Sequence, residues 1–131
     1  MLNIKETVTY GQSESLFFLT CMAQFENRQK IYVMITFEEF LEMKDNGSVQ
    51  EDIPPLLQAL LLDASGDWEN AHRIAQNFPG KDGSWVHAYL HRVEGDTGNA
   101  AYWYRSAGKK LSELSLSEEW EYIAIALLKK S

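Results

Sequence analysis

Two segments of the chain repeat one pattern, and the offset between their leading residues Gly66 and Gly95 is 29 residues. The segments Gly66-Asp67-Trp68-Glu69-Asn70-Ala71 and Gly95-Asp96-Thr97-Gly98-Asn99-Ala100 share Gly, Asp, Asn and Ala at matching positions. Gly-Asp is typical of a turn followed by a helix N-cap, and the small alanine lets one helix cross close to its neighbour. A period of this length predicts helical hairpins stacked against each other.

Helix signals continue on both sides of the repeat. Thr36 and Glu39 have capping-box spacing, and Pro54-Pro55 is typical of a first helical turn. We expect helices over 37–44, 54–64, 68–78, 84–93 and 96–107, and a last one from residue 115 or 117 to 128. The predicted fold is therefore all-α, a right-handed stack of antiparallel helical hairpins over residues 34–131.

Residues 1–33 follow a different pattern. Leu2, Ile4, Val8 and Tyr10 alternate weakly like a strand, and periodicity does not decide between helix and strand for the apolar run 16–25. We expect 1–33 to be a poorly specified or non-native extension. One hypothesis takes Met34 as the initiator.

Composition and charge narrow the function classes. The length of 131 residues, with 45% apolar and 24% charged side chains, fits one globular domain. The net charge of -7 repels phosphate backbones and anionic lipids, so we expect no nucleic-acid and no membrane partner.

The lone Cys21 excludes an internal disulfide and a cysteine-rich zinc site. No run reaches the 18 apolar residues of a membrane helix, and Glu6 and Glu14 interrupt the leader a secretion signal needs, so we expect a cytoplasmic protein.

The second repeat, with the helix Asn99-Ala100-Ala101-Tyr102-Trp103-Tyr104-Arg105-Ser106-Ala107-Gly108, resembles the tetratricopeptide repeat and, more closely, the Sel-type short helical repeat. The resemblance covers about residues 56–108. The stretch 85–108 also resembles small bacterial proteins with a similar Trp-x-His-Ala-Tyr-Leu-His-Arg run. These resemblances imply a repeat-like helical fold that binds a partner.

Metal binding is the most specific alternative to partner binding. His87, His91 and Glu94 lie at i, i+4 and i+7, on one side of the fourth expected helix, and His72 could approach from the preceding hairpin. Two imidazoles one turn apart can chelate a divalent metal, and a carboxylate one turn further could complete a set of three. The order is not His-Glu-x-x-His and no spacing dictates a fourth ligand, so we favour a structural role and expect no cofactor.

Other catalytic patterns are absent from the sequence. It has no Gly-x-Ser-x-Gly elbow, and Gly80-Lys81-Asp82-Gly83 reads as a turn without the spacing of a phosphate loop. The pairs Glu38-Glu39 and Glu118-Glu119 suit first helical turns, where carboxylates favour the helix dipole. We therefore expect no catalytic residues, and an enzyme is the less favoured reading.

The leading prediction is a protein-protein interaction module. Tyr102, Arg105 and Arg92 would line an exposed groove, with His87 and His91 on the same binding surface. Such a surface would hold a protein segment or peptide. Self-association is expected if the apolar end of the two repeats is not covered by residues 120–128. The alternative is a metal-binding protein or metal-dependent enzyme with the His-x3-His-x2-Glu helix face.

Overall fold

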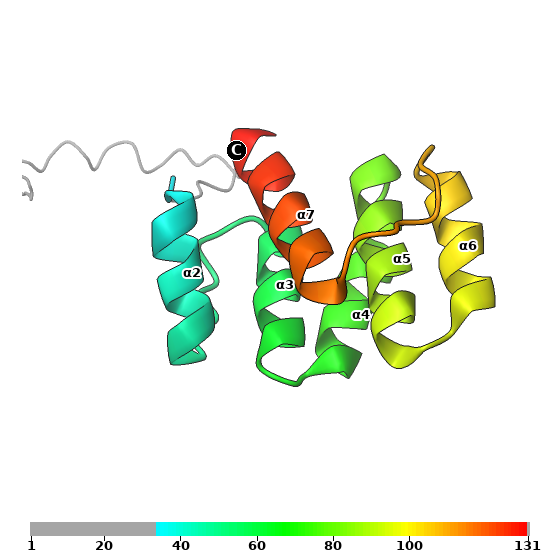
Figure 1. Cartoon of the computed structure of the whole chain (residues 1–131). Helices are drawn as coiled ribbons and strands as arrows, with labels where there is room; N and C mark the ends of the chain where they lie inside the picture. Colours follow the sequence, from blue (N-terminus) through cyan, green and yellow to red (C-terminus); the bar gives the residue numbers. More distant parts are fainter. Residues whose placement is uncertain (1–33, 131) are drawn as a thin grey trace, which may run out of the picture. The chain divides into compact units, whose positions relative to one another are not determined.

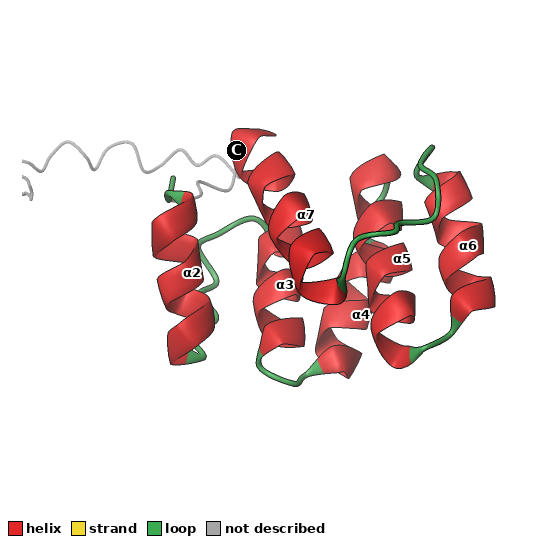
Figure 2. Cartoon of the chain, viewed as in Figure 1, coloured by secondary structure: helices red, strands yellow, loops and turns green. Residues whose placement is uncertain are grey.

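The structure is a computed structural model that describes residues 34–130, and its regular elements there are helices without strands (Figure 2). The helices are α2 (Phe37–Asn46), α3 (Pro55–Ala64), α4 (Trp68–Asn77), α5 (Lys81–Glu94), α6 (Thr97–Ser106) and α7 (Leu116–Lys130). The prediction of an all-α fold is confirmed. The expectations for residues 1–33, including Cys21, lie outside the described residues.

The two repeated segments fold alike at their starts. Asp67 caps α4 by accepting the Asn70 backbone N–H at 3.2 Å, and its other oxygen accepts the Asn70 side-chain amide at 2.6 Å. Asp96 caps α6 in the same way, with the Asn99 backbone N–H at 3.2 Å and its side-chain amide at 2.7 Å. The shared Asp-x-x-Asn pattern therefore encodes a cap in which both carboxylate oxygens accept from one Asn, at the start of the second helix of each hairpin.

Consecutive helices from α3 to α6 pack against their neighbours (Figure 1). The alanines of the repeat, Ala71 in α4 and Ala100 in α6, are fully buried where the helices meet. Close approach of the backbones explains why a small residue stands at both positions.

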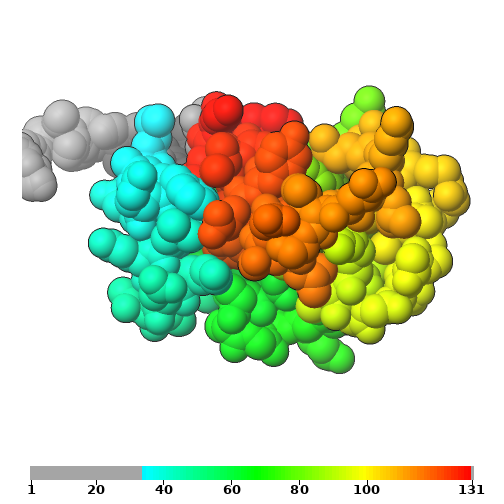
Figure 3. Space-filling view, viewed as in Figure 1, coloured from blue at the N-terminus to red at the C-terminus, as the bar shows by residue number. Residues whose placement is uncertain are grey.

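Helix α7 returns across the stack and packs on α3 and α5, and α2 packs on α3 and α7. Figure 3 shows α7 and the segment before it covering the middle of the visible face. Trp120 and Ile123 of α7 are buried, and the Trp120 indole N–H donates to the Leu60 carbonyl at 2.9 Å. The C-terminal helix thus covers apolar residues of α3 and α5 within the same chain.

Helix α5 begins earlier than the expected residue 84. Gly80, with φ of 98°, is its N-cap, and Lys81 is its first residue. Gly83 therefore lies inside the helix, where we expected a turn. The first turn of α5 fits against the Phe78 backbone because Gly83 has no side chain. A Cβ at Gly83 would lie 2.1 Å from the Phe78 carbonyl oxygen.

Among the described helices, none combines the length and the apolar character needed to cross a membrane.

Candidate metal centre

Three histidines meet between α4 and α5. His72 comes from α4, and His87 and His91 come from α5, where a spacing of four residues puts them on one face. One ring nitrogen from each lies within 4.8 Å of the others. These are the three histidines of the whole chain, so all of its imidazoles lie in one cluster.

Two tryptophans hold the imidazole rings in place. The Trp68 indole stacks on His72 with ring centroids 4.6 Å apart, and its N–H donates to the Leu90 carbonyl of α5 at 2.7 Å. Trp103 of α6 stacks on His87 at 4.1 Å. Because each indole covers one face of an imidazole, the cluster is packed before any ligand binds.

Hydrogen bonds set the orientation of the rings. His91 Nδ1 lies 2.7 Å from Glu94 Oε2, so the Nδ1–H donates to the carboxylate and Nε2 is the ring nitrogen left to face a metal ion. The Nε2 atoms of His72 and His87 lie 2.8 Å apart, which makes one the donor and the other the acceptor. A carboxylate behind a histidine is a common way to orient a metal ligand.

Burial favours the neutral form of two of the imidazoles, those of His72 and His87. His87 and His91 are 4% and 7% exposed, and His72 is half-buried. Burial, with a smaller effect of the charges that His72 and His91 carry when protonated, lowers the pKa of His87 to about 4. Burial also lowers the pKa of His72 from its ordinary value. Neutral imidazoles at pH 7 are the form that binds a metal ion.

The low pKa of His87 predicts a loss of stability in acid. Between pH 6.5 and 4 the unfolded chain takes up a proton on His87 and the folded chain does not, so the free energy of unfolding falls as the pH falls through this window. The full loss from this residue is about 3 kcal/mol. His72, His91 and Glu94 face the same ring or its neighbour, so the comparison needs a variant at His87 alone.

Urea unfolding from pH 7 to pH 4, in the presence of a chelator, measures this effect as the difference between the wild-type chain and His87→Gln. We expect the curve of the variant to be flatter by about 3 kcal/mol over the window. Parallel curves for the two proteins would show that His87 titrates normally in the folded state.

The expected site residues separate into two groups. His87 and His91 lie together, and the third nitrogen of the cluster comes from His72, whereas Glu94 is hydrogen-bonded to His91 behind the cluster. Glu94 and His91 form a second group of possible ligands with Asp96. The Asp96 carboxylate already caps α6, which favours the three-histidine set.

The residues expected to bind a partner do not share one surface. Tyr102 is 55% exposed and Arg105 is exposed on α6, so both are available to a partner. Arg92 instead forms an ion pair with Glu119 and donates to the Leu114 carbonyl at 2.9 Å. His87 and His91 are buried in the cluster described above. A protein partner at Tyr102 and Arg105 stays a prediction.

Sequence reasoning missed the role of Glu119. This residue was expected to favour a helix dipole, but its side chain is 2% exposed and accepts hydrogen bonds from Arg92 and from the Tyr104 hydroxyl. Burial and the bond to Glu119 raise the pKa of Tyr104 above its ordinary value. The three side chains link α5, α6 and α7. The sequence signal that could have indicated this role was the capping-box position of Glu118. Because Glu118 bonds the helix start, the adjacent Glu119 lies on a different side of α7.

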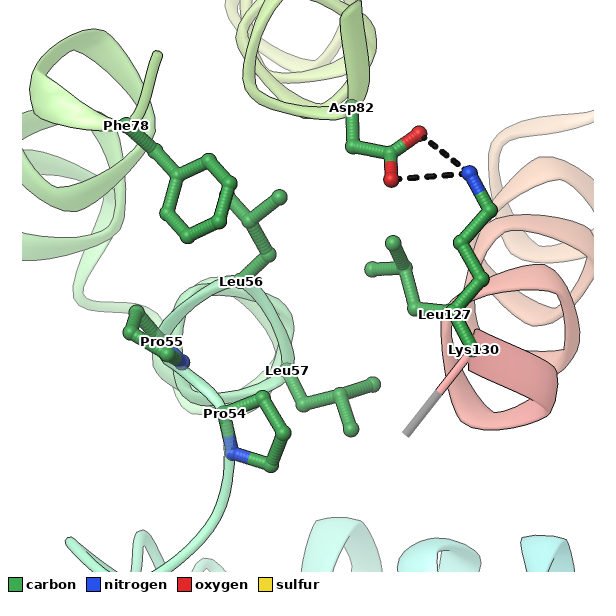
Figure 4. A pocket seen from close by; sticks show the side chains of 8 residues that line it. All are labelled: Pro54, Pro55, Leu56, Leu57, Phe78, Asp82, Leu127 and Lys130. Carbon is green, nitrogen blue, oxygen red and sulfur yellow. Dashed lines mark hydrogen bonds and ion pairs between the residues drawn. The ribbon is translucent and has the colours of Figure 1, made fainter. Parts of the chain in front are cut away.

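Away from the histidine cluster, a pocket of about 320 Å³ lies at the start of α3 and the end of α7 (Figure 4). Its walls are largely apolar, with Leu56, Leu57 and Phe78 among them. Its charged side chains, Asp82 and Lys130, are paired with each other at 2.8 Å. This pocket therefore offers no set of metal ligands comparable to the three imidazoles of the histidine cluster.

Comparison of the chain with protein-family models, with curated proteins and with solved structures gives no significant match.

Proposed function

We propose that the protein binds a divalent transition metal ion through His72, His87 and His91. The observation that carries the proposal is the convergence of one ring nitrogen from each histidine within 4.8 Å. Imidazole is a preferred ligand of zinc, nickel and copper, and three histidines from the protein are a known donor set for zinc.

The pair His72 and His87 needs only a small change in geometry to accept an ion. Metal–nitrogen bonds of about 2.0 to 2.1 Å in a tetrahedral site put neighbouring ligand nitrogens about 3.3 Å apart. The His72 and His87 nitrogens are 2.8 Å apart, so they must separate by about half an ångström, and the shared proton must leave the Nε2 atoms. His72 is half-buried and can make this adjustment at the edge of the cluster.

The other contacts support the same role. Glu94 accepts from His91 Nδ1 and so directs Nε2 toward a metal ion, and the indoles of Trp68 and Trp103 restrict the other two rings. Because the side chains are already ordered, binding loses less conformational entropy than at a flexible site.

The test is a calorimetric titration of the folded chain with zinc and nickel ions at pH 7. We expect one ion per chain, and we expect His72→Gln and His87→Gln to bind much more weakly. Glu94→Gln should weaken binding by about 10- to 100-fold, because it removes a partner behind a ligand and not a ligand itself. Glu121→Gln, on an exposed glutamate of α7, is the matched control and should bind like the wild type.

Absence of binding at micromolar metal would contradict the proposal. Equal affinity in the wild type and both histidine variants would also contradict it, because binding would then lie elsewhere on this acidic chain. Circular dichroism of each variant confirms that the helices remain folded.

A further inference from the structure

We propose that the metal ion at the three-histidine site keeps one exchangeable coordination position, and that this position takes a small anion through the surface pocket beside His72. The inference rests on the proposed function. It adds that the site is open on one side and names the class of ligand that reaches the ion.

The count of protein ligands leaves this position free. Zinc-like ions in proteins are commonly four-coordinate, and sites with three protein ligands hold a water molecule or a substrate in the fourth position. Glu94, the nearest carboxylate on α5, is used by His91 Nδ1 at 2.7 Å. Asp96 is engaged by Asn99 as the cap of α6.

The cluster is open toward one side. Two of its histidines are almost fully buried, whereas His72 lines a surface pocket of about 360 Å³. The pocket is lined by Trp68, Glu69, His72, Arg73 and Gln76. A ligand in this pocket lies next to the one metal-binding residue that reaches the surface.

The charge of the site selects the ligand. Three imidazole ligands carry no negative charge, and Glu94 is the carboxylate bonded to one of them, so a divalent ion keeps a net positive charge that a small anion reduces without a large space requirement. Arg73 on the pocket wall adds a positive side chain, and Glu69 adds a negative one, so the wall itself is nearly balanced. The attraction for an anion therefore comes mainly from the ion.

The experiment uses the full chain loaded with Co²⁺, whose visible absorption reports its coordination, and azide as the anion. We expect the visible band to change with added azide and to saturate. Gln76→Phe places an aromatic ring in the pocket one helical turn from His72, and it should weaken azide binding by about tenfold or more while Co²⁺ still binds. Gln50→Phe, at an exposed glutamine outside the pocket, should bind azide like the wild type.

The outcomes separate the two proposals. If Co²⁺ binds and azide leaves the spectrum unchanged, the fourth position is closed, which overturns this inference and retains the metal site. An azide response that is equal in Gln76→Phe and wild type would also overturn it, because the anion would then arrive by another route. If Co²⁺ fails to bind, the proposed function itself is overturned.

Discussion

Replacement of Glu119 with alanine should lower the free energy of unfolding by about 3 to 5 kcal/mol. The side chain is buried, and its two oxygens accept from the Arg92 guanidinium and the Tyr104 hydroxyl. Alanine would leave a partly buried cation and a buried hydroxyl without their acceptor. An uncompensated charge costs much more than the intact pair contributes, and this explains the size of the effect.

Urea unfolding at pH 7 of metal-free protein measures the loss. Glu121→Ala removes an exposed glutamate from the same helix and should change the free energy of unfolding by less than about 0.5 kcal/mol. Glu119→Gln keeps an acceptor for Tyr104 but removes the charge facing Arg92. Its loss of unfolding free energy should therefore be smaller than that of Glu119→Ala and larger than that of Glu121→Ala. A loss of less than about 1 kcal/mol in Glu119→Ala would show that this network does not hold α5, α6 and α7 together.

Replacement of Gly83 with alanine should be destabilising by about 3 kcal/mol. A Cβ at this position would lie 2.1 Å from the Phe78 carbonyl oxygen, and a backbone atom cannot rotate away as a side chain can. The start of α5 must then move away from the end of α4. Because α4 carries His72 and α5 carries His87, the same movement should also weaken metal binding.

Gly98→Ala is the matched control, because Gly98 is also a helical glycine with a negative φ. A Cβ there meets nothing closer than an Asp96 carboxylate oxygen at 3.9 Å. We expect this variant to be neutral or more stable by about 0.4 to 1 kcal/mol, since alanine favours a helix. Thermal unfolding and the zinc titration of both variants check the two effects. Equal stability of Gly83→Ala and Gly98→Ala would refute the close approach of Gly83 to the Phe78 carbonyl.

Local patterns predicted the helices well. The Asp-x-x-Asn caps, the capping box at Thr36 and the glycine at position 95 act over three or four residues, so the sequence alone shows both partners of each contact. The start of α5 was misjudged because two glycines flank Lys81-Asp82, and glycine is typical of turns. The glycine at position 83 instead permits the helix, because the Phe78 carbonyl lies where a Cβ would be, and the turn pattern of the sequence does not show this close approach.

The candidate site was only half predictable. The spacing of His87 and His91 follows from helix geometry, whereas the sequence offered His72 only as a residue that could approach, because its position depends on how α4 packs against α5. The same limit applies to Arg92 and Glu119, which are 27 residues apart and pair only after α7 returns to the stack. Periodicity shows which face of a helix is apolar; it does not show which polar side chains two distant helices bring together.

The indoles around the cluster make its state visible in the protein's own fluorescence. Trp68 and Trp103 stack on two of the histidines, whereas Trp85 and Trp120 contact Tyr122 and Phe40 elsewhere in the fold. Two of the chain's four tryptophans therefore contact the imidazoles, so protonation or an ion there should change part of the tryptophan emission, and no added dye is needed to follow it.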